Sequence, residues 1–174
     1  RTARGVAVVF TSAERARTLP RPVVLVAGAG FASKDGTQSS YFTQGDILAT
    51  AAVESGRDAY RRAALGPADI DVAEVYDCFT YIVMCQLEDM GFCKKGEGGA
   101  FVEGGRLRLG GALPTTTHGG LLSQAHMLGL NHVVELVRQL RGQAGRAQVA
   151  DAEVGLATGY GDLGDGAIMI MRRG

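Results

Sequence analysis

The chain has 174 residues, with 18 basic and 18 acidic side chains and 26 glycines. This length fits one domain, and the zero net charge favours a small ligand or a protein partner over nucleic acid or an anionic membrane surface. The three cysteines, Cys78, Cys85 and Cys93, form no CxxC pair, which is typical of a reducing cytoplasm. The apolar runs are far shorter than the ~20 residues of a membrane span, so no span is expected.

The first part of the chain predicts two strands and two helices. Val6 to Phe10 is a short β-branched run that predicts a strand. Residues 11–16 have the capping residues typical of a helix N-terminus, so a helix is expected to begin there. The apolar run from Val23 to Gly30 does not alternate, which is typical of a strand buried on both faces. Residues 47–65 predict an amphipathic helix that Gly66-Pro67 ends.

The remaining part alternates between strand and helix patterns. We expect a strand at 71–76, a helix at 79–90, a glycine-rich loop or hairpin at 96–111, a helix at 126–140, and strands at 152–158 and 167–172. This alternation, with helix-length spacings, predicts an α/β layered fold with a mixed sheet and helices on both of its faces.

Four polar clusters lie at the ends of predicted elements, where α/β folds build their sites. They are Tyr76-Asp77-Cys78, three threonines followed by His118, Gln124-Ala125-His126, and Gly159-Tyr160-Gly161-Asp162. A single tyrosine after a strand is most often a packing residue. A single histidine at a helix start is most often a cap or a surface residue. Only the combination of the clusters therefore points to a site.

The order of these segments resembles the thiolase superfamily, specifically the sterol-carrier-protein X type of thiolase and its lipid-transfer-protein relatives. The segments that carry the resemblance are 5–12, 74–79, 119–129, 136–149 and 155–167. The resemblance implies the second half of a duplicated fold, in which each half is a sheet between helices and the active site lies where loops of both halves meet. It places residues 1–18 at the end of the first half and 19–174 in a C-terminal thiolase-like domain.

The sequence departs from thiolases at the residues that carry their chemistry. His126 has the position of the family's catalytic histidine, Tyr76 replaces an asparagine or histidine, and Tyr160 stands near the expected cysteine base. The acylated cysteine of the family belongs to the first half, and none of the three cysteines lies in its motif. Claisen condensation and thiolysis need those thiols, so another reaction is expected.

This pattern is similar to that of the lipid-transfer-protein aldolases that cleave steroid side chains. A phenol can deprotonate a β-hydroxyl while an imidazole or a second phenol donates a hydrogen bond to the enolate oxygen. We therefore predict retro-aldol cleavage of a β-hydroxyacyl-CoA to a ketone and a shorter acyl-CoA. The expected acid/base groups are Tyr76 and Tyr160, and the expected enolate stabiliser is His126.

Further residues are expected to hold the substrate. His118 is the candidate for orienting substrate or water, and the other candidates are glycines, namely Gly119, Gly120 and Gly161. Asp162 and Asp165 either tune Tyr160 or serve only as turn residues. No metal and no cofactor are expected beyond the coenzyme A thioester of the substrate.

Two other functions stay open at this point. A thiolase-type acyltransferase, with Tyr160 in place of the missing cysteine, requires a first half that bears the nucleophile. A non-catalytic scaffold for lipid or acyl-CoA predicts that Tyr76 and Tyr160 pack away from any cavity. For the whole protein, the resemblance implies a homodimer and a small partner with an OB-fold and a zinc ribbon.

Overall fold

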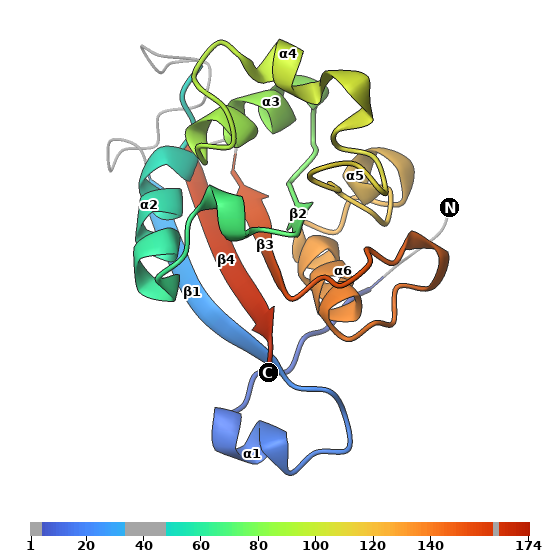
Figure 1. The fold of residues 1–174 in the computed structure, drawn as a ribbon. Helices are drawn as coiled ribbons and strands as arrows, with labels where there is room; N and C mark the ends of the chain where they lie inside the picture. Colours follow the sequence, from blue (N-terminus) through green and yellow to red (C-terminus); the bar gives the residue numbers. More distant parts are fainter. Residues whose placement is uncertain (1–4, 34–47, 162–163) are drawn as a thin grey trace.

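Four strands form one mixed sheet in the computed structural model, which describes residues 5–33, 48–161 and 164–174. The strands are β1 (Val24–Ser33), β2 (Val72–Glu74), β3 (Val154–Tyr160) and β4 (Asp165–Arg173). Their order is β1-β4-β3-β2. β4 is antiparallel to β1 and β3, whereas β2 and β3 are parallel (Figure 1). The predicted α/β fold with a mixed sheet is confirmed.

Helices pack on this sheet, apart from the first helix, which precedes β1 and lies away from the sheet (Figure 1). They are α1 (Ala13–Arg17), α2 (Ala52–Ala63), α3 (Thr80–Asp89), α4 (Gly98–Val102), α5 (Gly120–Ser123) and α6 (Leu130–Leu140), with 3-10 turns at Pro67–Asp69, Glu103–Gly105 and Gly145–Ala147. α2 packs on β1 and β4, and α6 packs on β2 and β3. Among the residues that the structure describes, no helix is both long and apolar enough to cross a membrane.

The alternating directions of the strand side chains build two separate cores. Leu156 and Ile170 belong to the core that includes residues of α2 and α3. Their neighbours in sequence, Ala157 and Met171, belong to the core that includes residues of α6. Successive side chains of a strand point to opposite faces, so β3 and β4 serve both cores. The run at 23–30, predicted to be buried on both faces, instead forms β1 at one edge of the described sheet, where Val26 is 46% exposed.

Two glycines of β1 allow the strand to lie directly against α2. A Cβ atom on Gly28 would lie 2.3 Å from the carbonyl oxygen of Ala59, and one on Gly30 would lie 2.0 Å from that of Ser55. Any side chain there would collide with the helix backbone, so these positions require glycine.

Some of the local predictions are wrong. Residues 6–10 form no strand; Val9 is 90% exposed and pairs with no strand in the described part of the chain, and a β-branched run without a ladder partner has nothing to stabilise it. The stretch 96–111, predicted as a loop or hairpin, contains α4, where Glu88 of α3 accepts a hydrogen bond from the Gly98 N–H at 2.8 Å. That contact comes from tertiary structure, which local composition does not encode.

Two predicted helices begin later than expected. The helix predicted at 126–140 begins as α6 at Leu130, because Gly129 at its N-cap has a φ of 82°. The helix predicted from residue 47 begins as α2 at Ala52, and residue 47 itself lies outside the described residues.

Candidate active site

Tyr76 follows β2 and is fixed by a closed set of buried hydrogen bonds. Its N–H donates to Thr158 Oγ1 of β3 at 2.8 Å, and its carbonyl oxygen accepts from Gln86 Nε2 of α3 at 2.8 Å. Thr158 Oγ1 in turn donates to Gln86 Oε1 at 2.6 Å. Thr158 and Gln86 are 4% and 1% exposed. Three elements therefore hold the backbone of Tyr76 through polar groups that have no access to water.

The structure brings the three predicted catalytic residues together. The Tyr76 hydroxyl and His126 Nε2 are hydrogen bonded at 3.0 Å. The ring of Tyr160, at the end of β3, has its centroid 6.4 Å from that of Tyr76. These side chains come from sequence positions separated by up to 84 residues and converge at one end of the parallel pair β2 and β3. Two phenols and one imidazole thus form a compact polar group.

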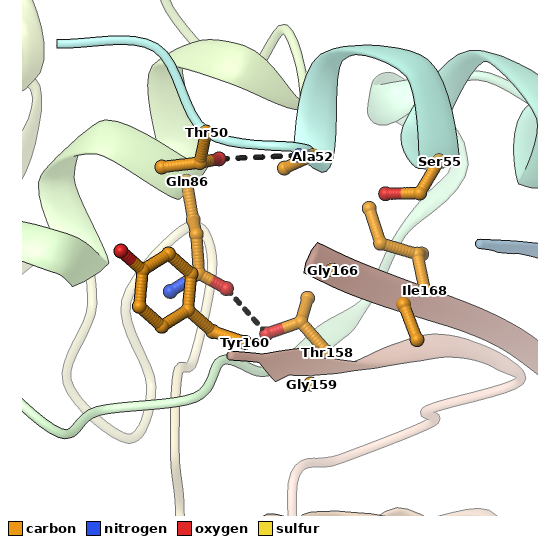
Figure 2. Close-up of a pocket in the computed structure, with 10 residues that line it drawn as sticks. Thr50, Ala52, Ser55, Gln86, Thr158, Gly159, Tyr160, Gly166 and Ile168 are labelled. Atoms are coloured by element: carbon orange, nitrogen blue, oxygen red, sulfur yellow. Dashed lines mark hydrogen bonds between the residues drawn. The ribbon is translucent and has the colours of Figure 1, made fainter. Parts of the chain in front are cut away.

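Tyr160 lines a narrow pocket between the ends of β3 and β4 and the start of α2 (Figure 2). Gln86 and Thr158, which hold Tyr76, line the same pocket, whereas Tyr76 is 7% exposed and is not among its lining residues. The scaffold hypothesis has both tyrosines packed away from any cavity. The burial of Tyr76 fits it, and the pocket beside Tyr160 has no room for a water molecule, so this pocket gives no argument against it.

The remaining predicted site residues have structural contacts in the described part of the chain. Gly120, with a φ of 60°, leaves no space for a side chain, since a Cβ atom would lie 2.1 Å from Asp77 Oδ2. This close approach, next to Gly119 at the N-cap of α5, lets Asp77 accept a hydrogen bond from the Leu121 N–H at 2.8 Å. Gly161 donates its N–H to the Asp165 carbonyl oxygen, as turn chemistry predicts. Their expected role in substrate binding stays a prediction, and Asp162 lies outside the described residues.

A second polar cluster lies beside the first and contains two residues that we did not predict. Glu74 Oε2 is 2.9 Å from His118 Nδ1 and 3.6 Å from His132 Nδ1. His132 Nε2 is 3.3 Å from Asp77 Oδ1. The rings of His132 and Tyr76 have centroids 6.1 Å apart, so the two clusters are neighbours. His118 Nδ1 is held by Glu74, and its expected role in orienting substrate or water stays a prediction.

Burial and charge oppose each other in this second cluster. Burial alone would raise the pKa of Glu74, but the contacts with His118 and His132 outweigh it and lower that pKa. Burial likewise opposes ionisation of Asp77, and the contact with His132 still lowers its pKa. The pKa of His132 is raised, because its two carboxylate partners outweigh the effect of burial. The cluster therefore favours two carboxylates and a positive charge between them.

Sequence reasoning missed Glu74, Gln86 and His132 because each stands inside a predicted element. A signal was present in α6, where polar residues occupy positions that the helix period assigns to the buried face. These residues are Asn131, His132, Glu135 and Gln139, all at most 3% exposed. Polar side chains at core positions of an amphipathic helix indicate a buried polar network.

The layered mixed sheet, with polar residues gathered at the ends of β2 and β3, is the architecture of a thiolase-type domain. The chain belongs to the thiolase C-terminal domain-like family, whose model matches residues 33–173. The predicted resemblance is therefore confirmed, while the boundary predicted between residues 18 and 19 stays a prediction.

Three comparisons place the chain within this family. It is 46% identical over 140 residues to the 17-hydroxy-3-oxo-4-pregnene-20-carboxyl-CoA lyase of Mycobacterium tuberculosis (strain ATCC 25618 / H37Rv), and 41% identical over 140 residues to a steroid side-chain-cleaving aldolase of Thermomonospora curvata. Each match covers 79% of this chain and 36% of the relative. The solved structure of the Ltp2-ChsH2(DUF35) aldolase matches with a TM-score of 0.85 and 36% identity, over 92% of this chain and 42% of that chain. The chain thus spans less than half the length of these relatives.

Proposed function

We propose that the whole protein is a retro-aldolase that cleaves a β-hydroxyacyl-CoA, of the steroid side-chain class, to a ketone and a shorter acyl-CoA. The observation that carries this proposal is the hydrogen bond of 3.0 Å between the Tyr76 hydroxyl and His126 Nε2, with the Tyr160 ring 6.4 Å from the Tyr76 ring. The names of the two relatives support it. One name contains a 17-hydroxy group and a 20-carboxyl-CoA thioester, the two functional groups that a retro-aldol cleavage needs.

The proposed reaction moves one proton and two electron pairs in its bond-breaking step. Tyr76, acting as a phenolate, takes the proton of the β-hydroxyl, and the electron pair of that O–H bond forms the carbonyl bond of the ketone. The bond between the α- and β-carbons breaks, and its electron pair becomes the enolate of the thioester. His126 donates a hydrogen bond to the enolate oxygen, and the Tyr160 phenol gives a proton to the α-carbon. The proton that Tyr76 has taken then passes to Tyr160, which restores both groups. No further cofactor is needed, because the thioester itself takes up the electron pair.

The close pairing of Tyr76 and His126 supports this division of roles. Their polar atoms lie at hydrogen-bond distance, so a substrate that reaches one of them reaches the other. The buried hydrogen bonds from Thr158 and Gln86 hold Tyr76 in place before substrate binds. A base that is positioned in advance loses little conformational entropy in the transition state.

The test uses the full-length protein, with its partner, and a β-hydroxy steroid-CoA as substrate. We expect formation of a ketone and a shorter acyl-CoA, and a loss of kcat of at least about 100-fold in Tyr76→Phe and in Tyr160→Phe, as for removal of a general acid or base. Tyr60→Phe is the matched control. Tyr60 is on α2 and packs against the core that includes residues of α2 and α3, not against the site. Full activity of the double variant Tyr76→Phe/Tyr160→Phe, or absence of ketone from the unaltered protein, would overturn the proposal.

We also propose that the whole protein works in the cytoplasm as a homodimer with a small partner that contains an OB-fold and a zinc ribbon. The name of the solved Ltp2-ChsH2(DUF35) aldolase supports a partner, because it joins two proteins. Three free cysteines support a reducing compartment. Light scattering on the co-expressed proteins tests the assembly, and a mass that fits a single full-length chain alone would contradict it.

A further inference from the structure

Glu74, His118 and His132 each have one potential metal-ligand atom in a small cluster next to the ring of Tyr76. Glu74 Oε2 is 2.9 Å from His118 Nδ1 and 3.6 Å from His132 Nδ1. Each of the three residues has one possible ligand atom that lies within 4.8 Å of those of the other two. Ligand atoms at ~2.0–2.1 Å from a tetrahedral zinc ion are about 3.3 Å apart. Small shifts of the side chains would therefore bring the three atoms to the spacing of metal ligands.

The inward atoms of these residues are buried and lack directed hydrogen bonds. The three side chains are at most 5% exposed. Within the described residues, neither Glu74 Oε2 nor the Nδ1 atom of His118 or His132 has a partner at hydrogen-bond geometry, although the atoms are close enough for ion pairs. Buried polar atoms normally have partners. A metal ion at their centre would give all three atoms a partner at once.

The outward atoms of Glu74 and His118 have hydrogen-bond partners, whereas His132 Nε2 has only the nearby Asp77 carboxylate and no partner at hydrogen-bond geometry among the described residues. Glu74 Oε1 accepts hydrogen bonds from the Thr117 N–H at 3.1 Å and from its hydroxyl at 2.8 Å. His132 Nε2 faces Asp77 Oδ1 at 3.3 Å, and His118 Nε2 faces the side-chain amide of Asn131 at 2.9 Å. Metal-binding histidines typically have their second nitrogen held by a carboxylate or an oxygen acceptor. Asp77 beside His132 Nε2 follows that pattern, whereas His118 Nε2 faces the amide nitrogen of Asn131.

The Asn131 side-chain amide can supply the hydrogen-bond acceptor that metal binding would require, if the amide group rotates by about 180°. Ligation through Nδ1 requires a hydrogen on His118 Nε2, which then needs an acceptor. Asn131 Oδ1 is buried and has no hydrogen-bond partner among the described residues. Turning the amide by a half turn places this oxygen against Nε2, and the two orientations differ only in which atom is assigned as nitrogen.

The charges of the cluster also favour a divalent cation. Glu74 and Asp77 are two buried carboxylates, and His132 lies between them. The next acidic group, Glu135, already pairs with Arg138 at 3.2 Å. A divalent ion bound by two neutral imidazoles would offset the negative charges of both carboxylates.

We propose that Glu74, His118 and His132 bind one divalent transition-metal ion of the zinc class. The ion has a structural role, since it joins the end of β2, which carries Tyr76, to α6 and to the segment before α5. Three protein ligands leave a further position for water. His118 and Asn131 also line a cavity of about 250 Å³ beside the site.

The test measures metal bound to the full-length protein without a histidine tag and without its partner, after removal of metal with a chelator. Titration with Co²⁺ is expected to give one bound ion per chain with the visible absorption of a four-coordinate site. His118→Ala and Glu74→Gln are expected to lose this ion, and Asn131→Ala is expected to weaken binding by about 10- to 100-fold. His126→Ala is the matched control, because it removes a histidine outside the cluster and is expected to keep one ion per chain.

Two results would overturn the inference. They are no bound Co²⁺ in the unaltered protein, and one ion per chain in both His118→Ala and Glu74→Gln. The first would show that the histidines and carboxylates contact one another without a metal ion. If His132→Ala does not fold, the other two ligand variants still decide. Because the readout is binding and not cleavage, this test can fail while the retro-aldolase proposal succeeds, and the reverse also holds.

Discussion

At the scale of single residues, Gly129 makes room for the ring of Tyr76. A Cβ atom at this position would lie 2.9 Å from Tyr76 Cδ2 and 3.1 Å from Cε2, and φ is 82°. Gly129→Ala is therefore expected to displace the phenol from His126. Since a shift of about 1 Å in a reacting group can cost 100-fold in rate, we expect kcat of the full-length protein to fall by at least about tenfold.

A control separates this displacement from backbone strain. Gly142 has a φ of 69°, and a Cβ atom added there would have nothing within 4 Å, so Gly142→Ala has a similar strain of ~1–2 kcal/mol but no collision. It is expected to lower the melting temperature and leave kcat unchanged. Equal kcat values for the two variants would show that Gly129 does not position Tyr76.

The site residues that were predicted, and those that were missed, show what could be inferred from the sequence. Tyr76, His126 and Tyr160 were identified because each follows or precedes a predicted element at a place that resembles a family motif, and the structure brings them together. His132 was missed because a histidine within a helix has no local signal until the buried face of that helix is known. Its partner Glu74 is the last residue of a short strand, where the sequence predicts only packing.

At the scale of elements, Thr158 links β3 to the loop after β2 and to α3. Its hydroxyl accepts from the Tyr76 N–H and donates to Gln86 Oε1. Thr158→Val keeps the shape but leaves both partners buried without this bond, so we expect a loss of about 1–3 kcal/mol in the free energy of unfolding. Thr158→Ser, which keeps the hydroxyl, is expected to lose less. Urea denaturation measures both, and a larger loss for the serine variant would contradict the role of the hydroxyl.

The order of strands and helices was predictable, whereas the ends of several elements were not. The run at 23–30 forms β1, as its β-branched apolar residues predict. Its predicted burial on both faces is wrong, because β1 lies at one edge of the described sheet. The start of α6 depends on the conformation of Gly129, and the existence of α4 depends on a contact with Glu88. Both are set by tertiary structure, so periodicity alone could not place them.

At the scale of the whole molecule, the sheet separates two cores that should contribute independently to stability. Leu87 lies in the core that includes residues of α2 and α3, and Leu136 lies in the core that includes residues of α6. Both side chains are fully buried. Leu87→Ala and Leu136→Ala are each expected to lower the free energy of unfolding by about 2–5 kcal/mol. The double variant is expected to show the sum within about 0.5 kcal/mol, measured by denaturant unfolding. A shortfall of more than about 1 kcal/mol would indicate that the strands couple the two cores.

The strand order has a consequence for the synthesis of the protein. β3 and β4 follow the other two strands in sequence, yet they occupy the middle of the sheet and each pairs with a strand made much earlier. While the chain emerges from the ribosome, β1 and β2 have no neighbour between them, and their apolar residues stay exposed until residues 154–173 have been made. Tyr76 then meets Tyr160 in the same late event. Chains that await such distant pairings fold slowly and depend on chaperones in the meantime.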